Sequence, residues 1–129
     1  MLPAAARLTR SQEFGTVVRR GRRVGRPRLV VHALTVDRDA ENENSMPIQA
    51  GQHTARVGFV VSKAVGNSVL RHRVSRRLRH LMADRLGTLP PHCALVIRAL
   101  PASAAASSSE LGADLDGALR RLKLSGDVA

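Results

Sequence analysis

The sequence predicts an α+β fold, or a small α/β sandwich, in which helices pack on a sheet that contains a parallel strand–helix–strand unit. Apolar residues alternate over 57–63 as in a strand, recur at helical spacing over 70–82, and form a short β-prone run over 94–100. The chain has 129 residues, a length that suits one domain with an apolar core. We therefore predict a single domain over 1–122 and a flexible tail over 123–129.

The first predicted element is a short helix. Thr9 or Ser11 provides its N-cap, and Gly21 ends it after about Arg20. Its apolar side chains share one face at positions i, i+3 and i+4, namely Phe14, Val17 and Val18.

A first strand follows this helix. The segment from Val24 to Val36 contains a β-prone run from Leu29 onward, and Pro27 disfavours a central strand at its beginning, so the predicted start lies near Arg28. The next segment, 37–54, holds four of the ten acidic residues and little hydrophobicity. This composition predicts a mobile loop.

The middle of the chain contains the predicted strand–helix–strand unit. A strand over Arg56–Lys63 has apolar residues on both faces, and residues 66–68 form a turn and helix cap. The helix then extends to about Leu86, and its apolar positions are Leu70, Val74, Leu78, Leu81 and Met82. A third strand over 94–100 and a final helix over 109–122 complete the predicted elements.

The composition indicates a polyanionic partner. The 21 Lys and Arg residues outnumber 10 Asp and Glu, which gives a net charge of +11. All but Lys63 and Lys123 of these cations are arginine, whose planar fork binds phosphate well. The single cysteine, Cys93, precedes an apolar run and is interpreted as a core residue. No apolar run is long enough for a membrane helix and no signal peptide is visible, so we expect a cytoplasmic protein without a membrane partner.

Basic residues gather on one side of the central helix. On a helical wheel the apolar side chains span an arc of about 120 degrees, and the opposite arc is basic. That basic arc contains His72, Arg73, Arg76, Arg79 and His80. Residues 63–85 contain seven Lys or Arg and one acidic residue, Asp84, which gives this segment a net charge of +6. A second cluster over 7–28 has eight arginines against Glu13. A solvated surface is the alternative, but the scarcity of acidic residues favours a phosphate-binding helix.

Residues 57–79 resemble the defining motif of bacterial ribonuclease P proteins. In that family a strand leads into Ser-Lys-Lys-x-Gly-Asn, and then into Arg-Asn-Arg, two further basic residues and Leu-x-Arg. The upstream pattern of Arg10, Phe14, Val17, Arg19 and Gly21 is similar to the family's first helix. Two positions depart from the motif, because Ala64 replaces the second lysine and His72 replaces the asparagine. The segment 37–54 resembles an insertion.

The resemblance implies a fold, a function and a set of contacts. The fold is a small α-β sandwich with a left-handed β-α-β crossover. The protein would be a subunit of ribonuclease P, in a 1:1 complex with the catalytic RNA, and would assist endonucleolytic removal of the 5′ leader from precursor tRNA. Contacts to the catalytic RNA would come from Asn67, Arg71, His72, Arg73, Arg76, Arg77 and Arg79. A cleft between the first helix and the sheet would bind the leader through Phe14, Val18 and Lys63, although an apolar core position is an equally weighted alternative for Phe14.

The sequence shows no catalytic or metal-binding constellation of its own. The five histidines are scattered, and the two basic segments contain only Glu13 and Asp84 as acidic residues. We therefore expect the protein alone to be inactive and to bind no cofactor. The resemblance implies that the ribonucleoprotein requires Mg²⁺. The main alternative is a ribosomal or other structural RNA-binding protein. A DNA-binding helix is a weaker alternative, and a membrane-surface helix is weaker still.

Overall fold

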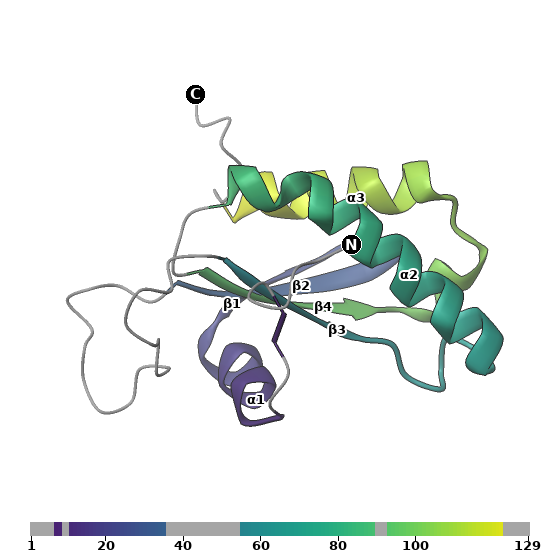
Figure 1. Ribbon diagram of the computed structural model, residues 1–129, viewed down its shortest axis with the longest axis horizontal. Helices are drawn as coiled ribbons and strands as arrows, with labels where there is room; N and C mark the ends of the chain where they lie inside the picture. The colour runs from purple at the N-terminus through teal and green to yellow at the C-terminus, as the bar shows by residue number, and fades with distance from the viewer. Residues whose placement is uncertain (1–6, 9–10, 36–54, 90–92, 123–129) are drawn as a thin grey trace.

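The computed structural model describes residues 7–8, 11–35, 55–89 and 93–122. The elements follow in the order α1 (Ser11–Arg20), β1 (Arg22–Gly25), β2 (Leu29–Thr35), β3 (Arg56–Val60), α2 (Ser68–Arg85), η3 (Leu86–Thr88), β4 (Cys93–Ala99), η4 (Pro101–Ala105) and α3 (Ser108–Arg121). The strands form one layer, with α1 on one face and α2 and α3 on the other (Figure 1). The predicted α+β fold is confirmed.

The sheet has the strand order β1-β2-β4-β3. β3 and β4 are parallel neighbours, whereas β1 pairs with β2 and β2 with β4 in antiparallel fashion. The chain leaves β3, returns through α2 above the sheet and enters β4 behind β3 (Figure 1). When the molecule is turned so that α2 faces the viewer and both strands point upward, β4 lies to the left of β3. This arrangement is a left-handed crossover, as the resemblance implies.

The prediction of the first strand was incomplete. It placed a strand from near Arg28, and β2 does start at Leu29, but the structure adds β1 at Arg22–Gly25 as the partner of β2 in a hairpin. Only Val24 in β1 is partly buried, and the other three residues are exposed. An edge strand of this kind takes its stability from backbone pairing with β2 rather than from its own side chains. It therefore has no alternating apolar pattern.

Two apolar clusters lie on opposite faces of the sheet. The larger one joins the sheet to α2 and α3, and the predicted helix positions Val74, Leu78 and Met82 are buried in it. The smaller one lies under α1 and consists of Leu8, Val17, Ala94 and Val96. β3 contributes to both clusters, since Val57 belongs to the larger and Val60 packs against the smaller. The prediction that both faces are covered is thus confirmed for β3, but the strand ends at Val60 and not at Lys63, because the chain turns at 63–65.

Cys93 is a core residue, as predicted. Its side chain is buried at the start of β4. Burial raises the pKa of the Cys93 thiol to about 12, because the thiolate would lose its hydration. The group is therefore a neutral apolar side chain at physiological pH.

Acidic residues of α3 anchor one arginine in the turn before β2 and one arginine of α2. Arg28 Nη2 lies 2.9 Å from Glu110 Oε2, and the Arg28 amide donates to the buried carboxylate of Asp114 over 3.3 Å. Arg85 Nε lies 2.7 Å from Asp116 Oδ1. These pairs connect the turn before β2 and the end of α2 to the same helix, so Glu110, Asp114 and Asp116 of α3 are engaged within the fold.

Three of the predictions fall outside the described residues. They are the Thr9 cap, the loop over 37–54 and the tail over 123–129. Among the helices that the structure describes, none is long and apolar enough to cross a membrane.

Candidate nucleic-acid interface

The basic helix α2 begins at a well-formed N-cap. The Asn67 side chain accepts a hydrogen bond from the Leu70 amide over 3.0 Å, so the predicted cap is confirmed. Gly66 has a φ of +153°, and a Cβ there would lie 2.7 Å from the Leu70 side chain. The turn therefore fixes where α2 starts and, with it, the direction of each basic side chain. A direct RNA contact by Asn67 remains a prediction.

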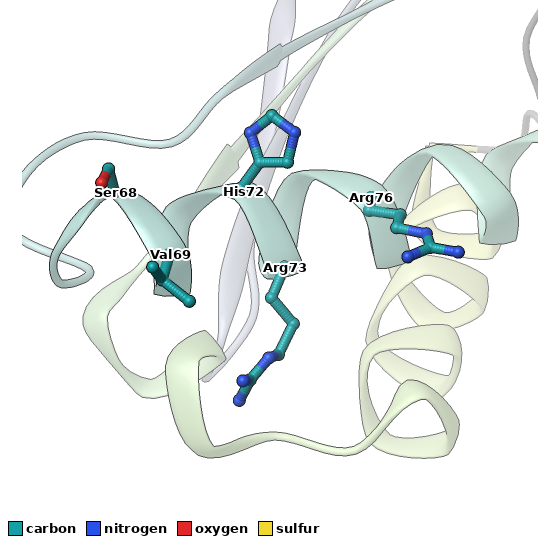
Figure 2. Close-up of a pocket in the computed structure, with 5 residues that line it drawn as sticks. All are labelled: Ser68, Val69, His72, Arg73 and Arg76. Atoms are coloured by element: carbon teal, nitrogen blue, oxygen red, sulfur yellow. The ribbon is translucent and has the colours of Figure 1, made fainter.

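The solvent-facing side of α2 carries four exposed cationic or titratable residues, which are His72, Arg73, Arg76 and His80. We call these four residues the α2 basic face. Ser68, Val69, His72, Arg73 and Arg76 line an open depression on it (Figure 2). A second depression is lined by Arg73, Arg76, Arg77, His80 and Ser108, the last from the start of α3. Arg73 and Arg76 line both depressions and therefore lie at the centre of the face.

The charges of this face are not neutralised within the described part of the chain. Among the described residues, no carboxylate forms an ion pair with Arg73 or Arg76. The side chains of Arg73 and Arg76 are exposed and extend from α2 in different directions (Figure 2). Uncompensated guanidinium groups on an exposed helix face provide charge and donors for several phosphates.

The other three predicted arginines lie on the flanks of α2 and are half-buried, namely Arg71, Arg77 and Arg79. Arg77 Nη1 donates to the Ala106 carbonyl over 2.7 Å, which ties α2 to the segment before α3. The Nε atoms of Arg71 and Arg79 are buried and have no hydrogen-bond partner among the described residues. Among the arginines predicted to bind RNA, Arg73 and Arg76 are thus exposed. The other three are half-buried against the rest of the fold.

The three residues predicted to bind the leader lie on α1 and after β3. Phe14 is half-buried and packs against the smaller apolar cluster, with its ring directly over Gly58 of β3. Val18 is 44% exposed and does not share the burial of Val17, although both were predicted to lie on one apolar face. Lys63 is exposed in the turn that follows β3. A common leader-binding cleft for these residues remains a prediction.

Strand pairing brings together three basic residues whose association the sequence analysis did not predict. Arg23 of β1 pairs with His32 of β2, and His32 pairs with Val96 of β4, two residues before Arg98. His32 is only 5% exposed. Burial, together with the positive charges of Arg23 and Arg98, lowers the pKa of His32 below its ordinary value of 6.5. Their association depends on register, which the separate sequence segments do not reveal.

Acidification should destabilise the protein through His32. In the unfolded chain this imidazole takes up a proton near pH 6.5. In the folded protein it takes up a proton only at lower pH, because the pKa of His32 is lowered. The stability that neutral His32 contributes is therefore complete above about pH 6.5 and decreases as the pH falls toward the folded pKa. Urea unfolding at several pH values should show this decrease in the wild type and a smaller one in His32→Gln. Equal pH dependence of the two proteins would contradict the assignment.

A metal site is not formed by the side chains of the described residues. No group of three or more His, Cys, Asp and Glu side chains is placed there to hold a metal ion. The four paired acidic residues instead bind arginines, among them Glu13, which accepts from Arg56 Nη2 over 2.8 Å. The exposed guanidinium groups of α2 offer hydrogen-bond donors and positive charge to an anion.

Comparison with known proteins identifies the family. The model of the Ribonuclease P family matches residues 2–123. The chain belongs to the ribonuclease P protein family. Two curated relatives are named ribonuclease P protein component. The one from Streptomyces bikiniensis is 52% identical to this chain over 124 residues, and the one from Rhodococcus erythropolis is 49% identical over 124 residues. The first alignment covers 95% of both chains, and the second covers 96% of this chain and 94% of the relative.

Solved structures of ribonuclease P proteins share the fold. The Staphylococcus aureus protein superimposes with a TM-score of 0.74 at 19% identity, covering 93% of this chain and 97% of the other. The Thermotoga maritima protein gives a TM-score of 0.69 at 18% identity, with coverage of 89% and 96%. Membership in the ribonuclease P family decides against the ribosomal-protein alternative.

Proposed function

We propose that this protein, as the protein subunit of ribonuclease P, binds the catalytic RNA through the α2 basic face. The observation that carries the proposal is the pair Arg73 and Arg76, which are exposed, line both depressions and have no ion-pair partner among the described residues. Arg71, Arg77 and Arg79 extend the face along its flanks. His72 offers an imidazole where the family has an amide, and an imidazole N–H can donate to a phosphate oxygen.

The second part of the proposal concerns the substrate. The 5′ leader of precursor tRNA binds on the α1 side of the sheet, near Phe14, Val18 and Lys63. The exposed part of the Phe14 ring offers an apolar surface to a base, and exposed Lys63 offers a charge to the backbone. α1 and α2 cover opposite faces of the sheet (Figure 1), so the protein can contact the catalytic RNA and the leader at the same time.

The third part concerns the chemistry. Hydrolysis of the phosphodiester takes place on the RNA subunit with Mg²⁺ that the ribonucleoprotein requires, and the protein itself binds no cofactor. The protein contributes affinity, and it assembles as a monomer with one catalytic RNA in the cytoplasm. The lack of a carboxylate cluster among the described residues supports this division of roles.

A cleavage assay of precursor tRNA tests the proposal. The purified protein alone should leave the precursor intact, whereas its addition to the cognate catalytic RNA at low Mg²⁺ should increase turnover. The expected reason is that the arginines neutralise phosphates that otherwise require Mg²⁺. Cleavage by RNA-free protein that persists after removal of contaminating nucleases would show that the protein carries chemistry of its own. An unchanged rate of the RNA with added protein would contradict the assisting role.

A further inference from the structure

The α1 side of the sheet carries a cluster of basic residues that spans three strands. Side chains of paired residues in neighbouring strands point to the same face, so Arg23 and His32 share a face, as do His32 and Val96. Arg98 is two residues beyond Val96 and projects to that face as well. Since Val96 packs in the cluster under α1, the face in question is the one that α1 partly covers.

The cluster has unused hydrogen-bonding capacity. His32 is only 5% exposed, and its Nδ1 atom has no hydrogen-bond partner among the described residues. Arg23 and Arg98 are exposed, and none of the carboxylates that the structure describes forms an ion pair with them. The carboxylate of α1 on this side, Glu13, is already bound to Arg56. A buried polar atom without a partner next to two unpaired guanidinium groups is an unfavourable arrangement for a free surface.

An oxyanion bound at this cluster would provide a partner for His32 Nδ1 and a negative charge for Arg23 and Arg98. A phosphodiester offers acceptors to both guanidinium forks, and its negative charge favours a protonated imidazole between them. An extended single strand can lie along residues that are spread over neighbouring strands of a sheet, whereas a folded RNA body fits such a surface less well.

We propose that Arg23, His32 and Arg98 form a phosphate-binding site on the α1 side of the sheet, and that its ligand is one backbone phosphodiester of a single-stranded RNA. This inference rests on the proposed leader-binding function and extends the path of the leader from Phe14 across β4 and β2 toward β1. The three residues act through charge and hydrogen bonding, so they contribute affinity regardless of the leader sequence.

The site can be tested in the reconstituted holoenzyme with a set of precursor tRNAs. Each precursor carries one uncharged methylphosphonate linkage at a different leader position. In the wild type, one linkage should weaken precursor binding by about tenfold, because it removes one charge-assisted hydrogen bond. Arg98→Ala should bind the unmodified precursor about tenfold more weakly and be insensitive to that same linkage, with a salt slope lower by roughly 0.7. Arg98→Lys should restore part of the affinity, and Arg121→Ala on α3 is the control for removal of a charge elsewhere.

A second measurement follows His32 directly. The NMR titration of its imidazole in the full-length protein should give a higher pKa when a leader oligonucleotide is bound than when the protein is free, and Arg98→Ala should reduce that difference. If Arg98→Ala and Arg23→Ala bind precursor as the wild type does, while the wild type still prefers precursor over mature tRNA, this site is wrong and the leader-binding proposal remains. If the wild type shows no preference for the leader, the leader-binding proposal fails and this inference fails with it.

Discussion

Replacing Arg73 and Arg76 together by alanine should weaken binding of the catalytic RNA by about a hundredfold or more and flatten its salt dependence. Both side chains are exposed at the centre of the α2 basic face and are unpaired within the described chain. A hydrogen bond to a charged group contributes roughly 1.5–3 kcal/mol, so two such bonds amount to at least about 3 kcal/mol. The log–log salt slope should decrease by roughly 0.7–0.9 for each phosphate that is no longer neutralised, or about 1.4–1.8 in total. Filter binding over a series of salt concentrations measures both quantities.

A double variant of equal charge provides the control. Arg120 and Arg121 are exposed at the C-terminal end of α3, at the opposite end of the helical layer from the start of α2 (Figure 1). Their replacement by alanine removes the same two charges and should change affinity and slope much less. If the Arg73/Arg76 variant keeps the affinity and slope of the wild type, the α2 basic face is a solvated surface and does not bind RNA.

Replacing Phe14 by alanine should reduce both fold stability and the preference of the holoenzyme for precursor tRNA. The ring packs on the backbone of Gly58 and against the smaller cluster, so its removal leaves a gap beside β3. Phe→Ala in a core costs about 3–5 kcal/mol of unfolding free energy, and the half-buried ring should give a value near the lower limit. Loss of a base-stacking surface should lower the precursor preference by roughly tenfold, since such stacking contributes about 1–3 kcal/mol. Urea unfolding and competition between precursor and mature tRNA measure the two effects.

Two further variants separate these effects. Phe14→Leu retains apolar volume without the planar ring, so it should remain folded and still lose precursor preference. Gly58→Ala keeps the ring but places a methyl group 2.6 Å from its Cε1 atom, which must displace the ring and should reduce stability and preference together. If Phe14→Leu and a folded Phe14→Ala protein both keep the full preference, Phe14 is a core residue and the leader does not bind there.

The elements with strong local signals could be predicted from the sequence. The Asn67 cap and the spacing of Val74, Leu78 and Met82 fix the position of α2, because both signals depend only on neighbours within a few residues. β1 could not be predicted in the same way, because its pairing with β2 stabilises it and its exposed residues carry no pattern. The parallel unit was predicted from the order of its segments, but the hand of its crossover entered only through the resemblance.

The candidate site shows the same division between local and non-local information. Helical periodicity predicts which residues share the α2 basic face, but it does not show that Arg77 is held by the Ala106 carbonyl. Likewise, the sequence separates Arg23 from Arg98 by most of the chain, and only the strand register places both beside His32. Contacts that depend on tertiary packing could therefore be identified only from the structure. The positive charge of α2 and its position on one side of the helix could be predicted from the sequence.

The burial of Cys93 determines how the protein responds to thiol chemistry. Because burial raises the pKa of Cys93 to about 12, the thiol is protonated at pH 7, and the core encloses the side chain. Because the chain has no second cysteine, alkylating and oxidising agents have no exposed sulfhydryl to attack in the native protein. Disulfide-linked dimers and mixed disulfides with glutathione can then arise only from molecules whose core has opened. Covalent capture of this sulfhydryl thus reports the opening of the native core.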